Sequence, residues 1–223
     1  MVLIVMALMG CKGKNMEEAK KVFTEDDSVP AFQVVVLFDN SISYKSFVDV
    51  TLQNVTRLFQ HLAKQDRGDE NIRASLILID TKASILFNGK ARDLQGAYDD
   101  VVKVLKEGQS AYTDLTEATK RALYFLKQGQ AKRKIIVIFS DMKASTPKYY
   151  PSDKETVPPP PDFPWDELKK EKAEVYAFCV PLPEWRLWEP VMTEKGLPIT
   201  ERVPEDQDIK AGNAFKVVFR KEQ

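Results

Sequence analysis

Two uninterrupted runs of apolar, mostly β-branched residues constrain the fold of this chain more than any other feature. They are VVVLF at residues 34–38, within QVVVLF (33–38), and IIVIF at residues 135–139, within KIIVIF (134–139). A strand with one face in water alternates apolar and polar residues, so a run without alternation predicts a strand that is buried on both faces. Helices must cover such strands above and below the sheet, which points to an α/β architecture.

The rest of the chain supplies further strands and helices in alternation. Residues 72–80 and 84–89 predict a hairpin across the short polar turn TKA, and residues 174–180 and 214–219 predict two more strands. Apolar residues at helical spacing predict helices within residues 48–62, 94–105 and 115–126. We therefore expect a doubly wound, mostly parallel sheet with one antiparallel edge strand and helices on both faces.

Small oxygen-bearing side chains follow the first of the buried runs. Asp39, Ser41 and Ser43 stand at alternate positions directly after residues 33–38. In an open α/β sheet, ligands bind beyond the carboxyl ends of the strands, so these residues are candidates for a site. The same pattern also fits a helix N-cap, because serine and aspartate oxygens accept hydrogen bonds from the first amides of a helix. Taken alone, the pattern leaves both interpretations open.

Further oxygen-bearing residues are predicted at the same edge of the sheet. Ser140 and Asp141 follow the second buried run, and Tyr112, Thr113 and Asp114 stand just before the third predicted helix. Together with the first loop, they form a donor set of carboxylates and hydroxyls without Lys, Arg or His. An oxygen-only donor set suits a hard divalent cation such as Mg²⁺. A magnesium site is therefore a candidate function of this edge.

The segments VVVLFDNSIS, YTDLTEAT and IIVIFSD together resemble the metal-ion-dependent adhesion site of von Willebrand factor type A (vWA) domains. The resemblance implies that Ser41, Ser43 and Thr113 offer hydroxyls to Mg²⁺ or Mn²⁺. It also implies that Asp39 and Asp141 balance the charge of the ion, directly or through water. One open coordination position would then take an Asp or Glu of a protein partner, which gives binding without catalysis.

The resemblance covers roughly residues 33–220 and includes two departures from the pattern of the family. The family usually has glycines before the threonine, where this chain reads Ser110-Ala111-Tyr112. It usually has glycine after the second aspartate, where this chain has Met142. Neither departure removes a ligand atom, but we expect Tyr112 and Met142 to crowd the rim of the site.

A proline-rich segment follows the second aspartate. Residues 143–167 carry seven of the 13 prolines of the chain, which predicts an insertion that is not a core element. A loop of this length is uncommon in a compact domain and is usually functional or disordered. Because it begins directly after Asp141, we expect it to rise on the metal face and to act as a specificity loop; a plain solvated insertion is the alternative.

The N-terminus resembles the signal of a bacterial lipoprotein. The apolar decapeptide MVLIVMALMG precedes Cys11, and LMGC resembles the lipobox in which a cysteine accepts the lipid. The decapeptide is shorter than the about 20 residues that span a bilayer as a helix. We therefore expect residues 1–11 to be a signal peptide with its lipidated cysteine, residues 12–31 to be a polar tether, and residues 32–223 to be the vWA-like domain.

A lipoprotein signal implies that the protein lies in a bacterial cell envelope. Acyl chains on Cys11 would anchor it to the inner or the outer membrane, on the periplasmic or the surface side, without a spanning helix. The alternatives are a frayed apolar N-terminus and a fragment of a transmembrane helix.

Composition and single residues exclude several other classes. Basic and acidic residues balance at 33 each, so nothing indicates nucleic-acid binding. His61 is the only histidine, which argues against histidine acid–base chemistry, and we expect it to have a structural role. Cys179 is expected to be a small buried hydrophobe without a disulfide to Cys11. Trp185 and Trp188, at helical spacing, are expected to cover an edge of the core.

Two alternatives to metal-dependent binding stay open. A haloacid-dehalogenase-like phosphatase also has an aspartate after its first apolar strand, but it has a second acid where this chain has Ser41. The nearby acids Asp114 and Asp153 have no obvious group to position them as a general base. We therefore do not expect an enzyme. The other alternative is a scaffold of the same fold that binds partners without a metal.

Overall fold

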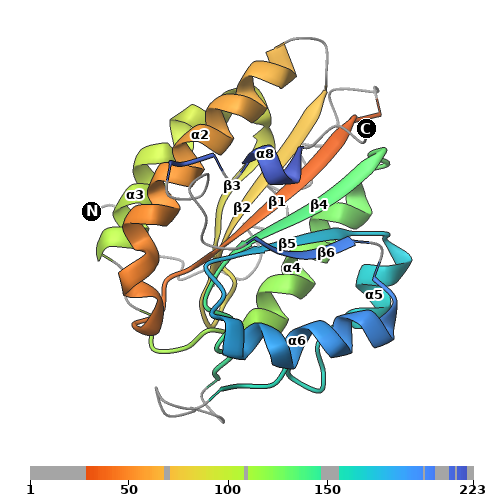
Figure 1. Ribbon diagram of the computed structural model, residues 1–223. Coiled ribbons are helices and arrows are strands. Elements are labelled where there is room, and N and C mark those ends of the chain that lie inside the picture. Colours follow the sequence, from red (N-terminus) through yellow and green to blue (C-terminus); the bar gives the residue numbers. More distant parts are fainter. Residues whose placement is uncertain are drawn as a thin grey trace, which may run out of the picture.

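The computed structural model describes residues 29–67, 71–107, 110–146, 156–197, 199–203, 211–213 and 215–219. These residues contain a six-stranded sheet with the strand order β3-β2-β1-β4-β5-β6 (Figure 1). Its strands are β1 (Phe32–Asp39), β2 (Ile72–Ile79), β3 (Ile85–Lys90), β4 (Arg133–Phe139), β5 (Glu174–Phe178) and β6 (Ile199–Val203). All neighbouring strands are parallel except β2 and β3, which form the expected hairpin. The expected fold class is confirmed.

The first apolar run occupies the centre of this sheet. Strand β1 lies between β2 and β4, with Phe32 opposite both Ile72 and Arg133. Its side chains alternate between two hydrophobic clusters, so that Val36 packs on one face and Leu37 on the other. Both clusters exclude water, which explains why this strand has no polar alternation.

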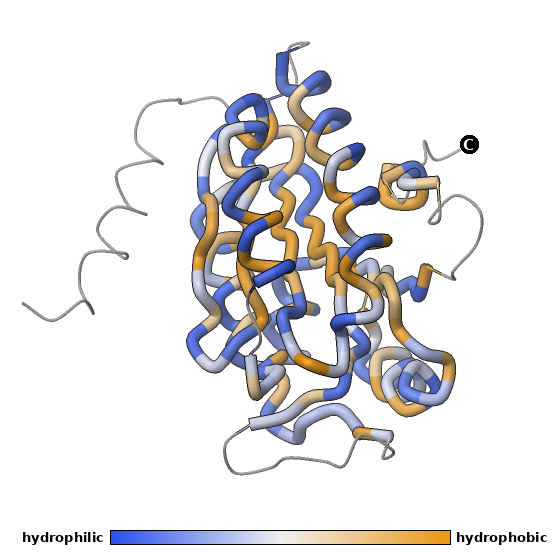
Figure 2. Tube along the Cα trace, turned by 90° about the vertical axis from the view of Figure 1, so that its left-hand side faces the viewer, coloured by the Kyte–Doolittle hydropathy of each residue, from blue (hydrophilic) through white to orange (hydrophobic). Residues whose placement is uncertain are grey.

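Helices cover both faces of the sheet. One face carries η1 (Ser43–Phe47), α2 (Val48–Arg67), η2 (Ala91–Ala97), α3 (Tyr98–Glu107) and α8 (Phe215–Val218). The other face carries α4 (Leu115–Gln128), α5 (Trp165–Lys170) and α6 (Leu182–Lys195). Figure 2 shows the hydrophobic strands between these layers. The arrangement leaves the loops at the carboxyl ends of the parallel strands together at one edge.

The predicted strand at residues 214–219 is wrong, because this segment forms the short helix α8. The Phe219 amide donates to the carbonyl oxygen of Phe215 at 3.0 Å, as in a helical turn. That turn places both phenylalanine rings against His61, at centroid distances of 4.6 and 5.2 Å. The strand that pairs with β5 is instead β6, with the sequence ITERV. It was not predicted, because two of its five residues are charged.

Part of the proline-rich segment belongs to the core, contrary to expectation. Val157 and Phe163 are buried in the same cluster as α4, and Trp165 begins α5. The ring of Phe163 lies 4.3 Å from that of Trp165 and 5.2 Å from that of Trp188. Large apolar side chains within the segment offset its lack of regular hydrogen bonding. Residues 147–155 lie outside the described residues.

Three structural roles that we expected for single residues are confirmed. Cys179 is buried and free, His61 is half-buried beneath α8, and Trp185 and Trp188 are buried in the cluster below α6. The expected signal peptide with Cys11, and all but the last three residues of the expected tether, lie outside the described residues. Within the described part of the chain, none of the helices combines the length and the apolar character that crossing a membrane requires.

Candidate functional site

Asp39 ends strand β1 and is fully buried. Its Oδ1 accepts a hydrogen bond from the Ser41 amide at 2.8 Å, and its Oδ2 accepts one from the Ser140 hydroxyl at 2.5 Å. Because β1 and β4 are parallel neighbours, Ser140 arrives at the same edge as Asp39. The carboxylate of Asp39 therefore ties the loop after β1 to the loop after β4.

The two serines of the first loop lie side by side. The Tyr44 amide donates to the Ser41 carbonyl at 3.2 Å, and this tight turn brings the Oγ atoms of Ser41 and Ser43 to 3.2 Å from each other. Ser41 is largely buried, whereas Ser43 is exposed. The N-cap of helix η1 is Ile42, which makes no side-chain cap hydrogen bond, so the serines do not act as a plain cap there. Their hydroxyls are left on one side of the loop.

The loop before α4 contacts both of the other loops. The Ser110 amide donates to the carbonyl oxygen of Asn40 at 2.7 Å, next to the serines. On the other side, the Thr113 amide donates to the Ser145 Oγ at 2.9 Å, and the Ser145 amide donates to the Thr113 carbonyl at 3.0 Å. Thr113 is buried between them. The residues predicted from three distant segments therefore belong to one network at one edge of the sheet.

Asp114 has a structural role as a helix cap. Its carboxylate accepts a hydrogen bond from the Glu117 amide at 2.9 Å, which makes it the N-cap of α4. Such a cap stabilises a helix by about 1 kcal/mol. The cap fixes the start of α4 directly after Thr113, so the orientation of the threonine is set by the helix that follows.

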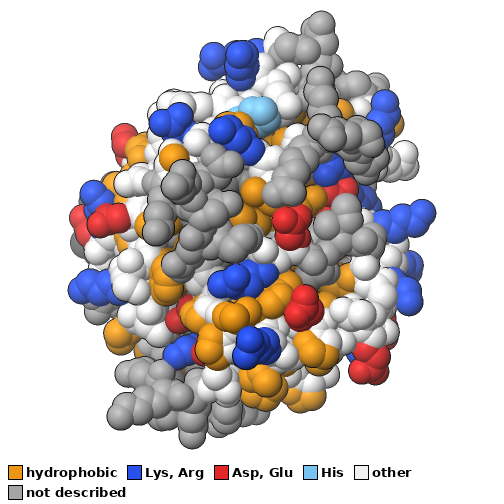
Figure 3. Space-filling view, in the orientation of Figure 1, with side chains coloured by type: hydrophobic (Ala, Val, Ile, Leu, Met, Phe, Trp, Pro, Cys, Tyr) orange, Lys and Arg blue, Asp and Glu red, His pale blue; other side chains and the backbone are white. Residues whose placement is uncertain are grey.

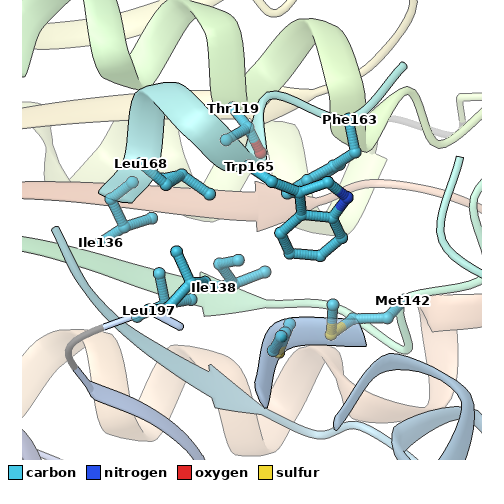
Figure 4. A pocket seen from close by; sticks show the side chains of 10 residues that line it. Thr119, Ile136, Ile138, Met142, Phe163, Trp165, Leu168 and Leu197 are labelled. Carbon is cyan, nitrogen blue, oxygen red and sulfur yellow. The ribbon is translucent and has the colours of Figure 1, made fainter. Parts of the chain in front are cut away.

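Met142 does not crowd the rim of the site, contrary to expectation. Its backbone has a φ of 57°, a left-handed conformation that favours glycine, which the resembled family has at this position. The side chain is fully buried and lines a cavity of about 10 Å³ with Phe163 and Trp165 (Figure 4). The left-handed turn sends the side chain into the core and away from the loops. Tyr112 is half-buried at the loop.

The electrostatics of the edge are dominated by two buried carboxylates. Asp141 is 2% exposed, and its Oδ1 accepts a hydrogen bond from the Lys143 amide at 3.1 Å. Burial raises the pKa of Asp39 to about 7, and the negative charge of Asp141 adds to the rise, while hydrogen bonds from Ser140 and Ser41 oppose it. Among the described residues, no lysine or arginine forms an ion pair with Asp39 or Asp141.

Two residues hold the site together: Ser140, which was predicted at this edge but without a role, and Ser145, which was not predicted. Ser140 hydrogen-bonds Asp39 and, through its Oγ, accepts the Met142 amide at 2.9 Å. Ser145 pairs with Thr113 from within the proline-rich segment. The position of Ser140 at a strand end was a usable signal. Nothing in the local pattern around Ser145 indicates its partner, because the contact joins segments 32 residues apart.

The donor set at this edge fits a hard cation. It consists of the two carboxylates Asp39 and Asp141 and the three hydroxyls of Ser41, Ser43 and Thr113, and all five donors are oxygens. The described residues contain no cluster of three or more His, Cys, Asp or Glu side chains that could hold a metal, so hydroxyls would have to complete the donor set. Mg²⁺ and Mn²⁺ accept carboxylate, hydroxyl and water oxygens. The residues present therefore suit such an ion.

No family model matches the chain, and no curated protein matches its sequence. Several solved structures have the same fold. The open form of the pilus adhesin SpaC from Lactobacillus rhamnosus GG has a TM-score of 0.59 at 12% identity. A von Willebrand factor type A structure from Catenulispora acidiphila has a TM-score of 0.58 at 11% identity. BatB from Bacteroides thetaiotaomicron has a TM-score of 0.53 at 13% identity.

These alignments cover most of this chain but different shares of the other proteins. They cover 87%, 86% and 84% of this chain for SpaC, the Catenulispora protein and BatB, respectively. The chain spans only 30% of SpaC and 42% of the Catenulispora protein, but 97% of BatB. The chain therefore has a vWA-like fold, which at these identities is a statement about architecture alone.

Proposed function

We propose that this chain is a binding module that holds Mg²⁺ or Mn²⁺ at the carboxyl edge of its sheet and engages a protein partner through the ion. Ser41, Ser43 and Thr113 supply hydroxyl ligands, and Asp39 and Asp141 supply the balancing charge. An ion held by these residues would supply the attraction for a carboxylate of the partner. No bond is made or broken, so the function is adhesion and not catalysis.

The pair of buried carboxylates carries this proposal. Asp39 is 0% exposed and Asp141 is 2% exposed, and neither has a basic partner among the described residues. Burying two like charges without a counter-charge is costly, and a bound cation removes that cost. The vWA-like fold is compatible with this function, and one protein of that fold is a pilus adhesin.

Calorimetric titration of the chain with Mg²⁺ and with Mn²⁺ tests the proposal. We expect saturable binding by the wild type and its loss in Asp141→Ala. Asp114→Asn is the matched control, because it removes the charge of a neighbouring carboxylate that is not a ligand, while its amide oxygen still caps α4. It should keep the wild-type affinity for the cation. Absence of binding by the wild type would favour the metal-free scaffold.

The position of Asp39 favours binding over hydrolysis. Both of its oxygens accept hydrogen bonds, from the Ser41 amide and the Ser140 hydroxyl, so it is held in place and not presented as a nucleophile. We therefore expect no turnover of an aryl phosphate with Mg²⁺. Phosphatase activity that disappears in Asp39→Ala would support the phosphatase alternative instead.

We also propose that a lipid on Cys11 anchors the chain in a bacterial envelope. The lipobox-like LMGC supports this, and the pilus adhesin of the same fold is compatible with a surface location. Labelling of cells with a fatty-acid probe should mark the wild type and Cys179→Ala, whereas Cys11→Ser should stay unlabelled. An unlabelled wild type would contradict the anchor without affecting the metal proposal.

A further inference from the structure

A pocket borders the candidate metal site. It has a volume of about 340 Å³ and is lined by Ala144, Ser145, Thr146, Val157, Pro158, Pro159, Pro160, Pro161 and Asp162. Ser145 belongs to both features, because it lines the pocket and its Oγ accepts the Thr113 amide at 2.9 Å. Ala144 follows Asp141 by three residues, which limits their separation to about 10 Å of extended chain. The pocket is therefore continuous with the metal face.

The far wall of the pocket is preorganised. Its four consecutive prolines, residues 158–161, have a backbone φ that is fixed by their rings. Val157 is 2% exposed and Phe163 is 7% exposed, so a buried side chain anchors each end of this wall in the core. The Phe163 amide also donates to the Pro160 carbonyl at 3.1 Å. A wall held in this way loses little conformational entropy when a ligand binds.

The pocket and its surroundings are suited to apolar groups. Asp162 is the only charged residue among the described residues of its lining, and it already lies 3.7 Å from the Lys120 ammonium of α4. Three large hydrophobic side chains are exposed in the described part of the chain, and two of them, Ile42 and Leu182, lie at this end of the sheet. The other, Val29, precedes β1 at the opposite end.

Leu182 is linked to the metal face through its helix. It is the first residue of α6, and Glu184, two residues on, lies 3.8 Å from the ammonium of Lys143 in the loop after Asp141. Figure 3 shows hydrophobic side chains gathered over α6, interspersed with charged ones. Exposed apolar residues grouped around a polar site are characteristic of a protein-binding surface.

We propose that this pocket receives an apolar side chain of the same partner segment whose acidic side chain binds the cation. The inference rests on the proposed function and deepens it, since it names the ligand as an extended segment with an acid and a large apolar residue close together. An extended chain advances about 3.3 Å per residue, so a pocket within about 10 Å corresponds to a spacing of two or three residues. The acid supplies attraction to the metal, and the apolar side chain supplies specificity.

Fluorescent nine-residue Gly/Ser peptides with one central Asp test the pocket. A single Leu is placed at each offset of one to four residues on either side, and affinity for the full chain is measured by fluorescence polarisation in Mg²⁺. We expect Leu at an offset of two or three residues on one side to tighten binding about tenfold over the Leu-free peptide, through burial of its side chain. Chelation of the metal should abolish binding of every peptide.

A pair of variants localises the effect. Pro159→Asp places a charge in the pocket and should remove the gain from Leu while keeping the affinity for the Leu-free peptide. Val29→Asp makes the same charge change at an exposed hydrophobic position at the far end of β1 and should change neither affinity. Circular dichroism of both variants verifies that the fold is retained.

The possible failures are distinguishable. If peptides bind only with metal but no Leu position improves affinity, or the gain persists in Pro159→Asp, the pocket assignment is wrong and the metal proposal stands. If binding is unchanged by chelation, the metal-dependent function itself is wrong. Absence of binding by every peptide at millimolar concentration would contradict both.

Discussion

Asp66 and Asp39 are both buried carboxylates in contrasting surroundings. Asp66 lies at the amino ends of the parallel strands and Asp39 at their carboxyl ends. Asp66 accepts hydrogen bonds from the amides of Ile72 and Arg92, both at 2.9 Å, and from the Arg92 Nε at 2.8 Å. Burial acts to raise the pKa of Asp66, but these bonds and the charge of Arg92 lower it overall. Asp39 faces Asp141 instead, and its pKa is raised to about 7.

The backbone shows the same contrast between the two edges. Among the described residues, four that are not glycine have positive φ, and Ala83, Met142 and Cys179 lie just beyond the ends of β2, β4 and β5. Only Lys172 lies at the other edge, before β5. Each such residue costs on the order of 1 kcal/mol. At the amino ends of the strands, the buried carboxylate Asp66 is paired and stabilises the fold. At the carboxyl ends, backbone strain and uncompensated negative charge remain, as in binding sites.

Removing Asp66 should have the largest effect, and it should act on stability alone. Asp66→Ala removes the buried carboxylate that accepts from the Arg92 Nε and from two amides, so we expect a loss of about 3 kcal/mol in the free energy of unfolding. Urea denaturation measures this loss, with the exposed Asp93→Ala as a control that should match the wild type. Mg²⁺ affinity should be unchanged; a parallel loss of affinity would break the separation of the two edges.

Asp39→Asn should have the opposite sign. The folded pKa of about 7 exceeds the ordinary 3.8, so the folded state prefers the protonated acid and its stability falls as pH rises from about 4 to about 7. The neutral amide removes this cost, and we expect the variant to gain about 2 kcal/mol at pH 8 without metal. Thermal unfolding at pH 8 measures this gain in stability. Addition of Mg²⁺ should raise the stability of the wild type but not that of the variant. A loss of stability would show that the carboxylate has a structural role like that of Asp66.

The affinity for Mg²⁺ should depend on pH through the same group. A cation binds the ionised carboxylate, so below pH 7 we expect the affinity to fall by up to about tenfold, or 1.4 kcal/mol, per pH unit, and to level off above it. Calorimetry in buffers of different ionisation enthalpy should also detect the release of a proton on binding at pH 6. A constant affinity between pH 6 and pH 8 would contradict the raised pKa of Asp39.

Met142→Gly should have the smallest effect and tests the backbone side of the comparison. Glycine relieves the left-handed strain, but loss of the buried side chain outweighs this relief, so we expect a net destabilisation of about 1 kcal/mol. Ala83→Gly is the matched control, because it relieves similar strain at a small buried side chain and should be neutral or slightly stabilising. Urea denaturation distinguishes the two. An increase in Mg²⁺ affinity in Met142→Gly would indicate that this side chain does restrict the site.

The sequence predicted which residues reach the carboxyl edge but not how they are held there. Asp39 and Asp141 each follow an apolar run whose composition predicts a buried strand. In a parallel sheet, the residues after such strands meet at the same end. The hydrogen bonds from Ser140 to Asp39 and between Ser145 and Thr113 join loops far apart in the chain. Local patterns carry no information about such contacts. The inward turn of Met142 likewise depends on a single backbone angle.

Hydrophobic periodicity encodes burial locally, so the amino-acid sequence suffices to predict the buried strands, the helices between them and the strand ends at which the oxygen donors gather. Long-range packing was needed to show that β6 pairs with β5, that residues 215–218 form a helix over His61, and that Val157 and Phe163 anchor the proline wall in the core. These outcomes depend on competition among distant segments for the same surface. A strand-like composition cannot settle that competition, because an apolar segment gains similar burial free energy in either conformation.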